Sequence, residues 1–319
     1  LRKKIFEIRR ELAANSSFVS ASNIIRSLQG EDETKHTIIE VFGYHNQLMK
    51  DQIGKGYANK TYRNYKVTMG FFEQFLRKHY HRSDIYLKEL TAKHIHDFFY
   101  YLRVSKGNTN NTAMKHLARL KKVVRFAIGN EWLVKNPFFN IKIHYDAIEK
   151  QILDMEDLHT LESKELPGKK LQKVRDIFVF MCYTGMAYID VKHLRRDMIR
   201  KGIDGNLWII GNRLKSTVRY SIPLLPQAVE IIKAYDDPEK TYALPVMSNQ
   251  KMNEYIKNIA TICEINKSLS CHSARHTFAT TVTLVNGVPI ETVSKMLGHT
   301  SLKITQQYAK VIDTKISQD

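Results

Sequence analysis

The chain has 319 residues and a mass of 37.2 kDa, a length that predicts two or three domains. Hydrophobic residues make up 43% and charged residues 26%, which is an ordinary globular composition. No apolar run is long enough for a membrane-spanning helix and no lipidation motif is present, so we expect no membrane partner. The net charge of +18 and the pI near 9.6 instead predict a polyanionic partner, most commonly nucleic acid.

The cysteines argue against two further classes of protein. The chain has three, Cys182, Cys263 and Cys271, and no pair has the spacing of a zinc knuckle or a redox motif. A disulfide framework and a cysteine-based zinc site are therefore not expected, and we predict a reduced, cytoplasmic setting. The sequence begins at Leu1 with no signal-peptide pattern, and we expect that an upstream segment precedes it.

The positive charge is concentrated in one part of the chain. Residues 51–150 carry 19 basic and 8 acidic side chains, a net charge of +11. The net charge is +2 over residues 1–50 and +5 over residues 151–319. This distribution predicts a binding module joined to a more neutral domain.

In chain order, the first elements predicted are helices. An amphipathic helix is expected over 1–14, and Asn59 is a plausible N-cap for a helix over 60–80. Thr91 opens a helix that runs to Arg103, and Thr112 starts a third that Asn136-Pro137 would close.

Basic residues line two of these helices and predict contacts with DNA phosphates. A solvated helix face is the competing interpretation. The residues are Lys60, Arg63, Lys66, Lys115, Arg119, Lys122 and Arg125.

The second half mixes helices with a block of short strands. Strands are predicted over 205–210, 212–215 and 219–223, and the remainder of 154–312 reads as mostly helical. The predicted fold class is mainly α with a small antiparallel sheet. We divide the chain into an N-terminal helix and linker over 1–34, a helical domain over 35–145 and a second domain over 146–319.

The residues that carry chemistry lie mostly in the last fifty. His272 and Arg275 are three apart and share one face of a helix that Ser270 can cap. Gly298 ends the next helix and places His299 in a turn, and a final helix carries Tyr308. Upstream, Lys215 closes the strand block.

This set of residue types suits phosphoryl transfer without a metal ion. Tyrosine can form a covalent ester, arginine matches phosphate oxygens, and histidine and lysine move protons between oxygens. No cluster of carboxylates is available to hold two magnesium ions, so we expect no cofactor and no metal.

The pattern resembles the tyrosine recombinase (phage integrase) family. The matching motifs are H-x-x-R at His272 and Arg275, L-G-H at 297–299, and a tyrosine nine residues later at Tyr308. Lys215 fits the family's hairpin lysine. The segment TGMAYIDV, residues 184–191, looks most like integrases of conjugative transposons. The resemblance implies a helical core-binding domain followed by a catalytic domain.

One position departs from the family pattern. The first catalytic arginine of the family falls at Ala187, and alanine cannot hold a phosphate. Arg175 is the leading candidate to replace it, with Arg213 as the second choice. Asp190 is predicted to orient Arg275 or His272, and His276 to make a structural hydrogen bond.

The resemblance implies site-specific cutting and rejoining of double-stranded DNA through a 3′-phosphotyrosyl intermediate. It also implies a homotetramer on DNA, docking of the last residues, 311–319, on a neighbour, and help from DNA-bending accessory proteins. Two alternatives stay open: a DNA-binding regulator that has lost catalysis, made credible by Ala187, and a type IB topoisomerase.

Overall fold

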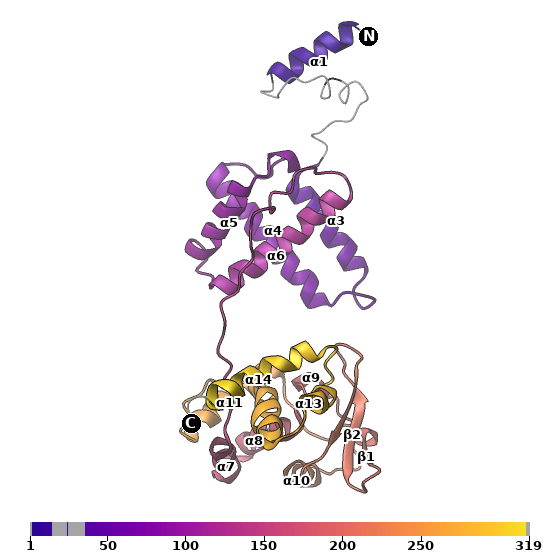
Figure 1. Ribbon diagram of the computed structural model, residues 1–319, viewed down its shortest axis with the longest axis vertical. Coiled ribbons are helices and arrows are strands. Elements are labelled where there is room, and N and C mark those ends of the chain that lie inside the picture. Colours follow the sequence, from indigo (N-terminus) through magenta and orange to yellow (C-terminus); the bar gives the residue numbers. More distant parts are fainter. Residues whose placement is uncertain (1, 15–23, 25–35, 317–319) are drawn as a thin grey trace. The chain divides into compact units, whose positions relative to one another are not determined.

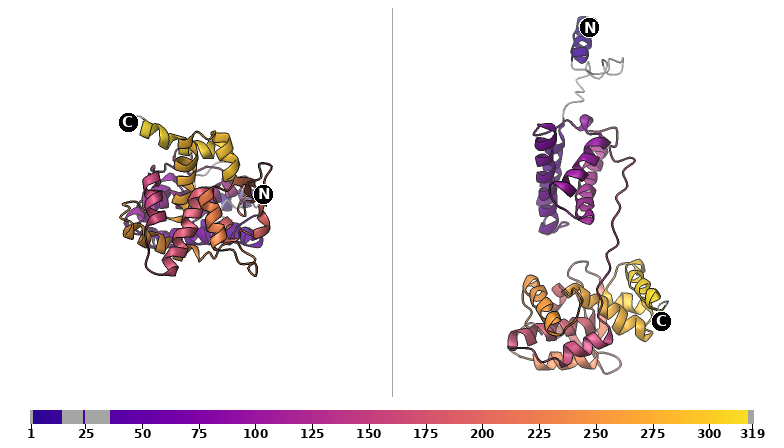
Figure 2. Two further views of the ribbon diagram at one scale, coloured as in Figure 1. Left: turned by 90° about the horizontal axis from the view of Figure 1, so that it is seen from below. Right: turned by 90° about the vertical axis from the view of Figure 1, so that its left-hand side faces the viewer.

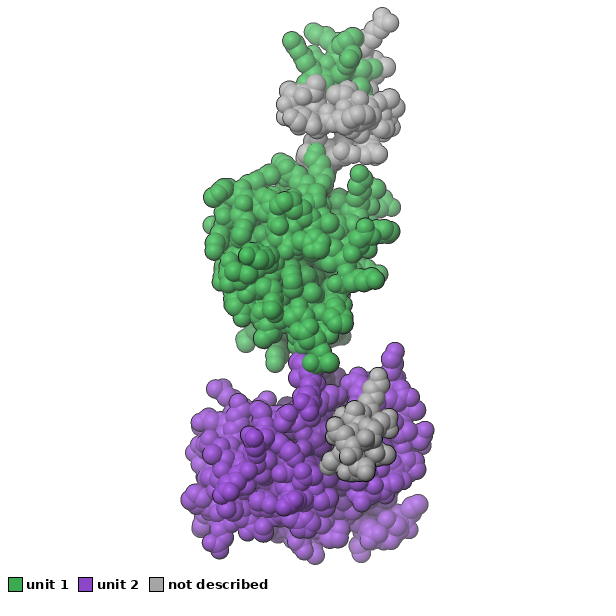
Figure 3. Space-filling model, turned by 60° about the vertical axis from the view of Figure 1, so that its left-hand side comes forward, with its two compact units in different colours: residues 1–147 green, residues 148–319 purple. Residues whose placement is uncertain are grey.

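The computed structural model describes residues 2–14, 24 and 36–316. The chain divides into two compact units, Leu1–Ala147 and Ile148–Asp319 (Figure 3). Of the predicted segment 1–34, helix α1 (Arg2–Ala14) is described, and nearly all of the remainder lies outside the described residues. The predicted fold class is confirmed, because the described elements are mainly helices with one three-stranded antiparallel sheet.

The first unit is built on four helices, shown from three sides in Figures 1 and 2. They are α3 (Ile38–Asp51), α4 (Asn59–Tyr80), α5 (Ala92–Val104) and α6 (Asn110–Gly129), with a short 3₁₀ turn at Leu87–Glu89. Helix α6 packs against the other three. Their apolar stripes meet in one core, in which Phe42, Phe72, Phe75, Phe98 and Leu120 are fully buried.

The boundaries of these helices test the predicted caps. Thr91 caps α5 as predicted, but α4 begins one residue early, after Ala58. The prediction that the third helix begins at Thr112 and runs toward Asn136-Pro137 is wrong. It starts at Asn110, where Thr109 accepts a hydrogen bond from the Thr112 amide, and it ends at Gly129. The stop precedes Glu131, whose φ of 62° is incompatible with a continuing helix. Helix α3 was not singled out from the sequence.

The second unit is organised around helix α8 (Lys169–Thr184), which contacts most of its neighbours. Nearly every residue of its second half is buried, from Ile177 to Thr184. The helices around it are α7 (Met155–Ser163), α9 (Tyr188–Lys192), α10 (Pro226–Ala234), α11 (Asn249–Ile262) and α12 (Cys271–Thr277). A helical stretch that is buried on all sides, as 177–184 is, belongs in the middle of a domain.

The sheet is formed by β1 (Ile199–Lys201), β2 (Leu207–Asn212) and β3 (Arg219–Pro223), in that order and antiparallel. Ile209 pairs with Ile199 on one side and with Ile222 on the other. Strand β1, which follows a 3₁₀ turn at Arg196–Met198, was not predicted. The predicted strand over 212–215 is wrong, because these residues enter a tight hairpin loop. In this loop the Arg213 amide donates to the Val218 carbonyl at 2.8 Å.

The remaining elements follow α12 directly. A π-helical stretch (Phe278–Thr283) and a 3₁₀ turn (Leu284–Asn286) lead to α13 (Ile290–Leu297) and α14 (Leu302–Ile316). Ser270 caps α12, and Gly298 ends α13 in the left-handed conformation, both as predicted. No helix in the described part of the chain is long and apolar enough to cross a membrane.

A buried histidine in the first unit predicts a pH-dependent stability. Burial, and secondarily the Arg119 charge, lowers the pKa of His116 to about 4. The unfolded state takes up this proton near pH 6.5 and the folded state does not, so stability is lost as the pH falls from 6.5 toward 4. Between pH 7 and pH 5 we expect His116 alone to remove about 2 kcal/mol from the free energy of unfolding.

The measurement is urea unfolding at both pH values, in a Trp208→Phe background so that Trp132 of the first unit is the fluorophore. His116→Gln should lose less stability than the parent by about that amount, since Gln keeps a partner for Thr68 and does not titrate. Equal losses in the two proteins would contradict the assignment.

Candidate active site

Arg275 is the most enclosed cation of the site. It is 5% exposed, and its guanidinium donates to the carbonyls of Gly185 and Leu297, both at 2.6 Å. These carbonyls end helices α8 and α13, where a helix leaves backbone oxygens without intrahelical partners. Burial, and then the Arg213 charge, lowers the pKa of Arg275 to about 10, so it is still cationic at neutral pH.

Arg213 reaches the same point from the β2–β3 hairpin. Its Nη1 donates to the Leu297 carbonyl at 2.8 Å, so two guanidinium groups share one backbone acceptor. The Nε atom of Arg213 lies 2.8 Å from Asp190 Oδ2, but the Nε–H bond is not directed at this oxygen, so the two atoms do not form a hydrogen bond. We therefore treat this contact as an ion pair. Asp190 itself is buried and also accepts the Leu214 amide at 3.0 Å.

The structure corrects two interpretations of this region. Asp190 pairs with Arg213 rather than orienting Arg275 or His272. Arg175 does not lie with Arg275 and Arg213. It pairs with Asp176 and donates to the carbonyls of Glu162 and Lys164. It lies ten residues before Gly185 on α8, roughly 15 Å along the axis. Ala187 sits at the N-cap of α9 without a charged group of its own, so Arg213 is the second arginine of the cluster.

Gly298 permits the arginines to approach. It has a φ of 60°, and a Cβ added there would lie 2.8 Å from Cγ of Arg213. Only glycine satisfies both the left-handed turn and the close passage of this side chain. The glycine of the L-G-H string is thus explained by the path of Arg213.

Tyr308 is buried beside these arginines. Its ring lies 6.1 Å from the parallel ring of His299 and 5.2 Å from that of His276, and His276 in turn contacts His272 at 4.4 Å. Burial raises the pKa of Tyr308, and the charges of Arg275 and Arg213 oppose that rise. The phenol is therefore neutral at rest, in a setting where cations favour its anion.

The three histidines around it are held neutral. Burial lowers the pKa of His299 to about 4 and that of His276 to about 3, and it also lowers the pKa of His272. Nearby cations act in the same direction in each case. A ring nitrogen of His299 lies 2.8 Å from the Thr305 hydroxyl. We predicted that His276 makes a structural hydrogen bond. Its Nδ1 atom makes none, because that atom is buried and has no partner among the described residues.

Two lysines complete the electrostatic setting. Lys215 is exposed on the β2–β3 loop, and its charge contributes to lowering the pKa of His272. Lys150, which the sequence analysis did not select, lies 5.0 Å over the Tyr308 ring. Two guanidinium groups, one carboxylate and two lysines leave the site positively charged and suited to an anion such as a phosphodiester. No group of three His, Cys, Asp or Glu side chains gathers as a metal site within the described residues.

The basic residues predicted to contact DNA lie on two helices in contact, α4 and α6. Six of the seven are exposed, and Arg119 is half-buried. Arg119 donates to the Thr68 hydroxyl at 3.3 Å, and Thr68 lies 2.8 Å from His116. This arginine is therefore held in place before any ligand arrives.

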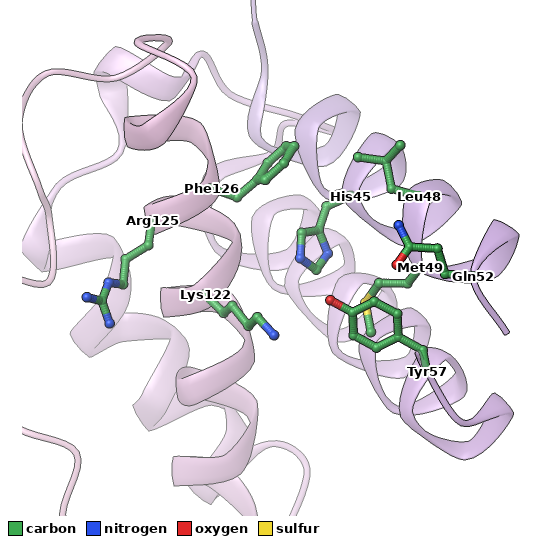
Figure 4. A pocket seen from close by; sticks show the side chains of 8 residues that line it. All are labelled: His45, Leu48, Met49, Gln52, Tyr57, Lys122, Arg125 and Phe126. Atoms are coloured by element: carbon green, nitrogen blue, oxygen red, sulfur yellow. The ribbon is translucent and has the colours of Figure 1, made fainter. Parts of the chain in front are cut away.

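A pocket of about 550 Å³ opens between α3 and α6 in the same unit (Figure 4). Lys122 reaches from α6 toward the ring of Tyr57, with its ammonium 5.7 Å from the ring centroid. His45 lines the pocket, and burial together with the Lys122 charge lowers its pKa. The pocket adds an aromatic, cation-bearing recess beside the basic residues of α6.

Comparison with known protein families shows which class of protein has this two-unit fold. The phage integrase SAM-like domain model matches residues 38–143, and the phage integrase family model matches residues 158–315. The chain belongs to the phage integrase family of tyrosine recombinases.

Among curated relatives, it is 25% identical over 306 residues to tyrosine recombinase XerD of Staphylococcus haemolyticus, covering 88% of this chain and 96% of that protein. XerD of Staphylococcus epidermidis is 24% identical, with the same coverage.

Solved structures of low sequence identity share the fold. A lambda integrase dimer bound to a COC′ core site superposes with a TM-score of 0.70 and 15% identity, over 95% of this chain and 84% of that one. The Tn1549 transposon integrase in complex with transposon right end DNA gives a TM-score of 0.68 and 13% identity, over 88% and 100%.

The pairing of Asp190 with Arg213 predicts a measurable coupling. Each single change, Asp190→Asn or Arg213→Met, leaves the other buried charge without its partner and should destabilise the second unit. The double variant should be more stable than the sum of the two losses predicts, by about 1–3 kcal/mol. Urea unfolding followed by Trp208, in a Trp132→Phe background, measures the cycle. Additive losses would show that the two side chains do not interact.

Proposed function

We propose that this protein is the site-specific recombinase of a mobile genetic element, acting by a 3′-phosphotyrosyl intermediate. The observation that carries the proposal is the burial of Tyr308 between two imidazole rings, within the field of Arg275 and Arg213. The mobile-element setting rests on the resemblance of residues 184–191 to conjugative-transposon integrases. Residues 35–145 would bind the core site and residues 146–319 would carry catalysis, in the bacterial cytoplasm.

The first step is attack of the Tyr308 oxygen on a phosphodiester. A P–O bond to the tyrosine forms, the P–O bond to the DNA 5′-oxygen breaks, and the 3′-phosphate is left on the enzyme. His272 accepts the phenolic proton, and Lys215 gives a proton to the departing 5′-oxygen. Because the ester keeps the bond energy, attack by a second 5′-hydroxyl reverses the step and joins a new strand.

Arg275, Arg213 and His299 would hold the non-bridging oxygens. The Leu297 carbonyl already holds the two guanidinium groups side by side, which would limit the reorganisation that accompanies the rise of charge in the transition state. His299 stays neutral, with one ring nitrogen at Thr305 and the other available to donate to the phosphate. Arg213 takes the role that the family pattern gives to the position of Ala187.

Strand exchange needs two duplexes, so the working form is proposed to be a homotetramer on DNA, with bending by accessory proteins. Lys60, Arg63, Lys66, Lys115, Arg119, Lys122 and Arg125 would contact the duplex. Docking of the tail 311–319 on a neighbour belongs to the same proposal; side chains from 310 onward lie outside the described residues.

The first test is covalent capture. DNA carrying the element's joined ends, nicked near the crossover so that religation is lost, should give a slow band with wild type on a denaturing gel and none with Tyr308→Phe. Arg213→Ala should slow adduct formation by roughly 100- to 1,000-fold, because it removes a preorganised donor to the transition state. Arg175→Ala, in a folded protein, should cleave at close to the parental rate.

The outcomes separate the alternatives. Equal DNA binding by wild type and Tyr308→Phe with no adduct from either would favour a regulator that has lost catalysis. Relaxation of any supercoiled plasmid, whatever its sequence, would favour a type IB topoisomerase. Rapid cleavage by Arg213→Ala together with loss of cleavage in Arg175→Ala would contradict the arginine assignment.

A second test uses the lowered pKa of His272. A base with a lowered pKa stays unprotonated to lower pH, so cleavage should persist below pH 6.5 and decline only at lower pH. The rate is measured at subsaturating DNA from pH 5 to 8, where it reports groups of the free protein. A midpoint at or above 6.5, or the same acidic limb in His272→Gln, would contradict this role.

A further inference from the structure

An extended segment at the start of the second unit, residues 148–154, is fastened to the catalytic helices; we call it the strap. The amide of Leu153 donates to the Thr277 hydroxyl at 3.0 Å, and the Thr281 hydroxyl donates to the Leu153 carbonyl at 2.5 Å. Leu153 is fully buried. Thr277 ends the helix that carries Arg275, so the strap is fixed to the same segment as the catalytic arginine.

Three residues upstream, the strap also holds the nucleophile helix. The Lys150 ammonium donates to Gln307 Oε1 at 3.1 Å and lies 5.0 Å from the centroid of the Tyr308 ring. No carboxylate of the described residues lies within salt-bridge distance of it. Its contacts are thus an amide and an aromatic face, both on α14.

The physical setting makes this contact more than a solvated surface lysine. Lys150 is half-buried, and burial lowers its pKa. A partly desolvated cation over an aromatic ring is held more firmly than one in open water. Its charge also reaches the catalytic cluster, since it is one cause of the lowered pKa of His272 and of His276.

We propose that Lys150 is a positioning residue of the reaction: bonded to Gln307 and placed over the Tyr308 ring, it holds the nucleophile against the catalytic histidines. The proposal rests on the proposed function of Tyr308. Because the strap is bound to α12 at Leu153, Lys150 connects the helix of Arg275 to the helix of Tyr308. Three extended residues span at most about 10 Å, so the two attachments fix each other closely.

The experiment compares four variants of the full chain. Lys150→Met removes the charge and keeps the stem, and Lys150→Arg keeps a cation that can bond to Gln307 and stack on the ring. Gln307→Ala removes only the hydrogen bond. Lys142→Met is the matched control: it removes an exposed positive charge upstream in the chain that makes no hydrogen bond or ion pair within the described residues.

Two readouts are taken on each variant. One is the single-turnover rate of adduct formation on nicked DNA at saturating concentration, with DNA affinity measured separately. The other is hydrogen exchange of residues 302–309 in the DNA-free protein, which does not depend on catalysis.

The expected result is adduct formation by Lys150→Met that is roughly 3- to 30-fold slower at unchanged DNA affinity, with faster exchange in 302–309. Lys150→Arg should recover the rate to within about threefold, Gln307→Ala should be intermediate, and Lys142→Met should match wild type. Unchanged exchange in Lys150→Met, or a loss confined to DNA affinity, would overturn the proposal. If wild type forms no adduct, the proposed function fails, and exchange alone decides whether Lys150 positions Tyr308.

Discussion

Two guanidinium groups, from Arg275 and Arg213, donate to one backbone carbonyl, that of Leu297, and the rest of the site is arranged around this contact. Like charges this close repel, and a single buried carboxylate, Asp190, neutralises only one of them. The folded protein therefore keeps an uncompensated positive charge out of water. In the proposed reaction an incoming phosphate would supply the missing negative charge, so part of the DNA binding energy would be released where the strand is cut.

The same contact explains how the chain tolerates Ala187. The proposed reaction needs a second guanidinium beside Arg275, and the β2–β3 loop places that of Arg213 there. The delivery depends on the ion pair with Asp190 on α9 and on the absence of a Cβ at Gly298. Because Asp190 and the Leu297 carbonyl hold Arg213 beside Arg275, the second guanidinium of this cluster does not have to come from position 187.

The sequence predicted the parts that depend on local patterns. The cap at Ser270, the left-handed Gly298 and the pairing of His272 with Arg275 on one helix follow from short-range rules. The choice between Arg175 and Arg213 did not, because it depends on contacts between residues far apart in sequence. Closeness to Gly185 along the chain favours Arg175, but Arg175 lies ten residues before it on α8, roughly 15 Å along the helix axis. No sequence pattern indicates a role for Lys150, because isolated lysines in extended segments are common. Its role depends on the contacts with Gln307 and Tyr308 of α14, which only the fold brings near.

The balance of charges around Tyr308 also decides which group must take its proton. In the DNA-free protein, Arg275 and Arg213 favour the phenolate against the cost of burial. In the proposed reaction a bound phosphodiester would place its negative charge between these arginines and the tyrosine oxygen, which would cancel much of that help. Deprotonation would then depend on a neutral base, and burial, which raises the pKa of Tyr308, lowers that of His272, the base of the proposed reaction. Lys150 lies over the ring of the same tyrosine, and its charge contributes to the lowered pKa of His272.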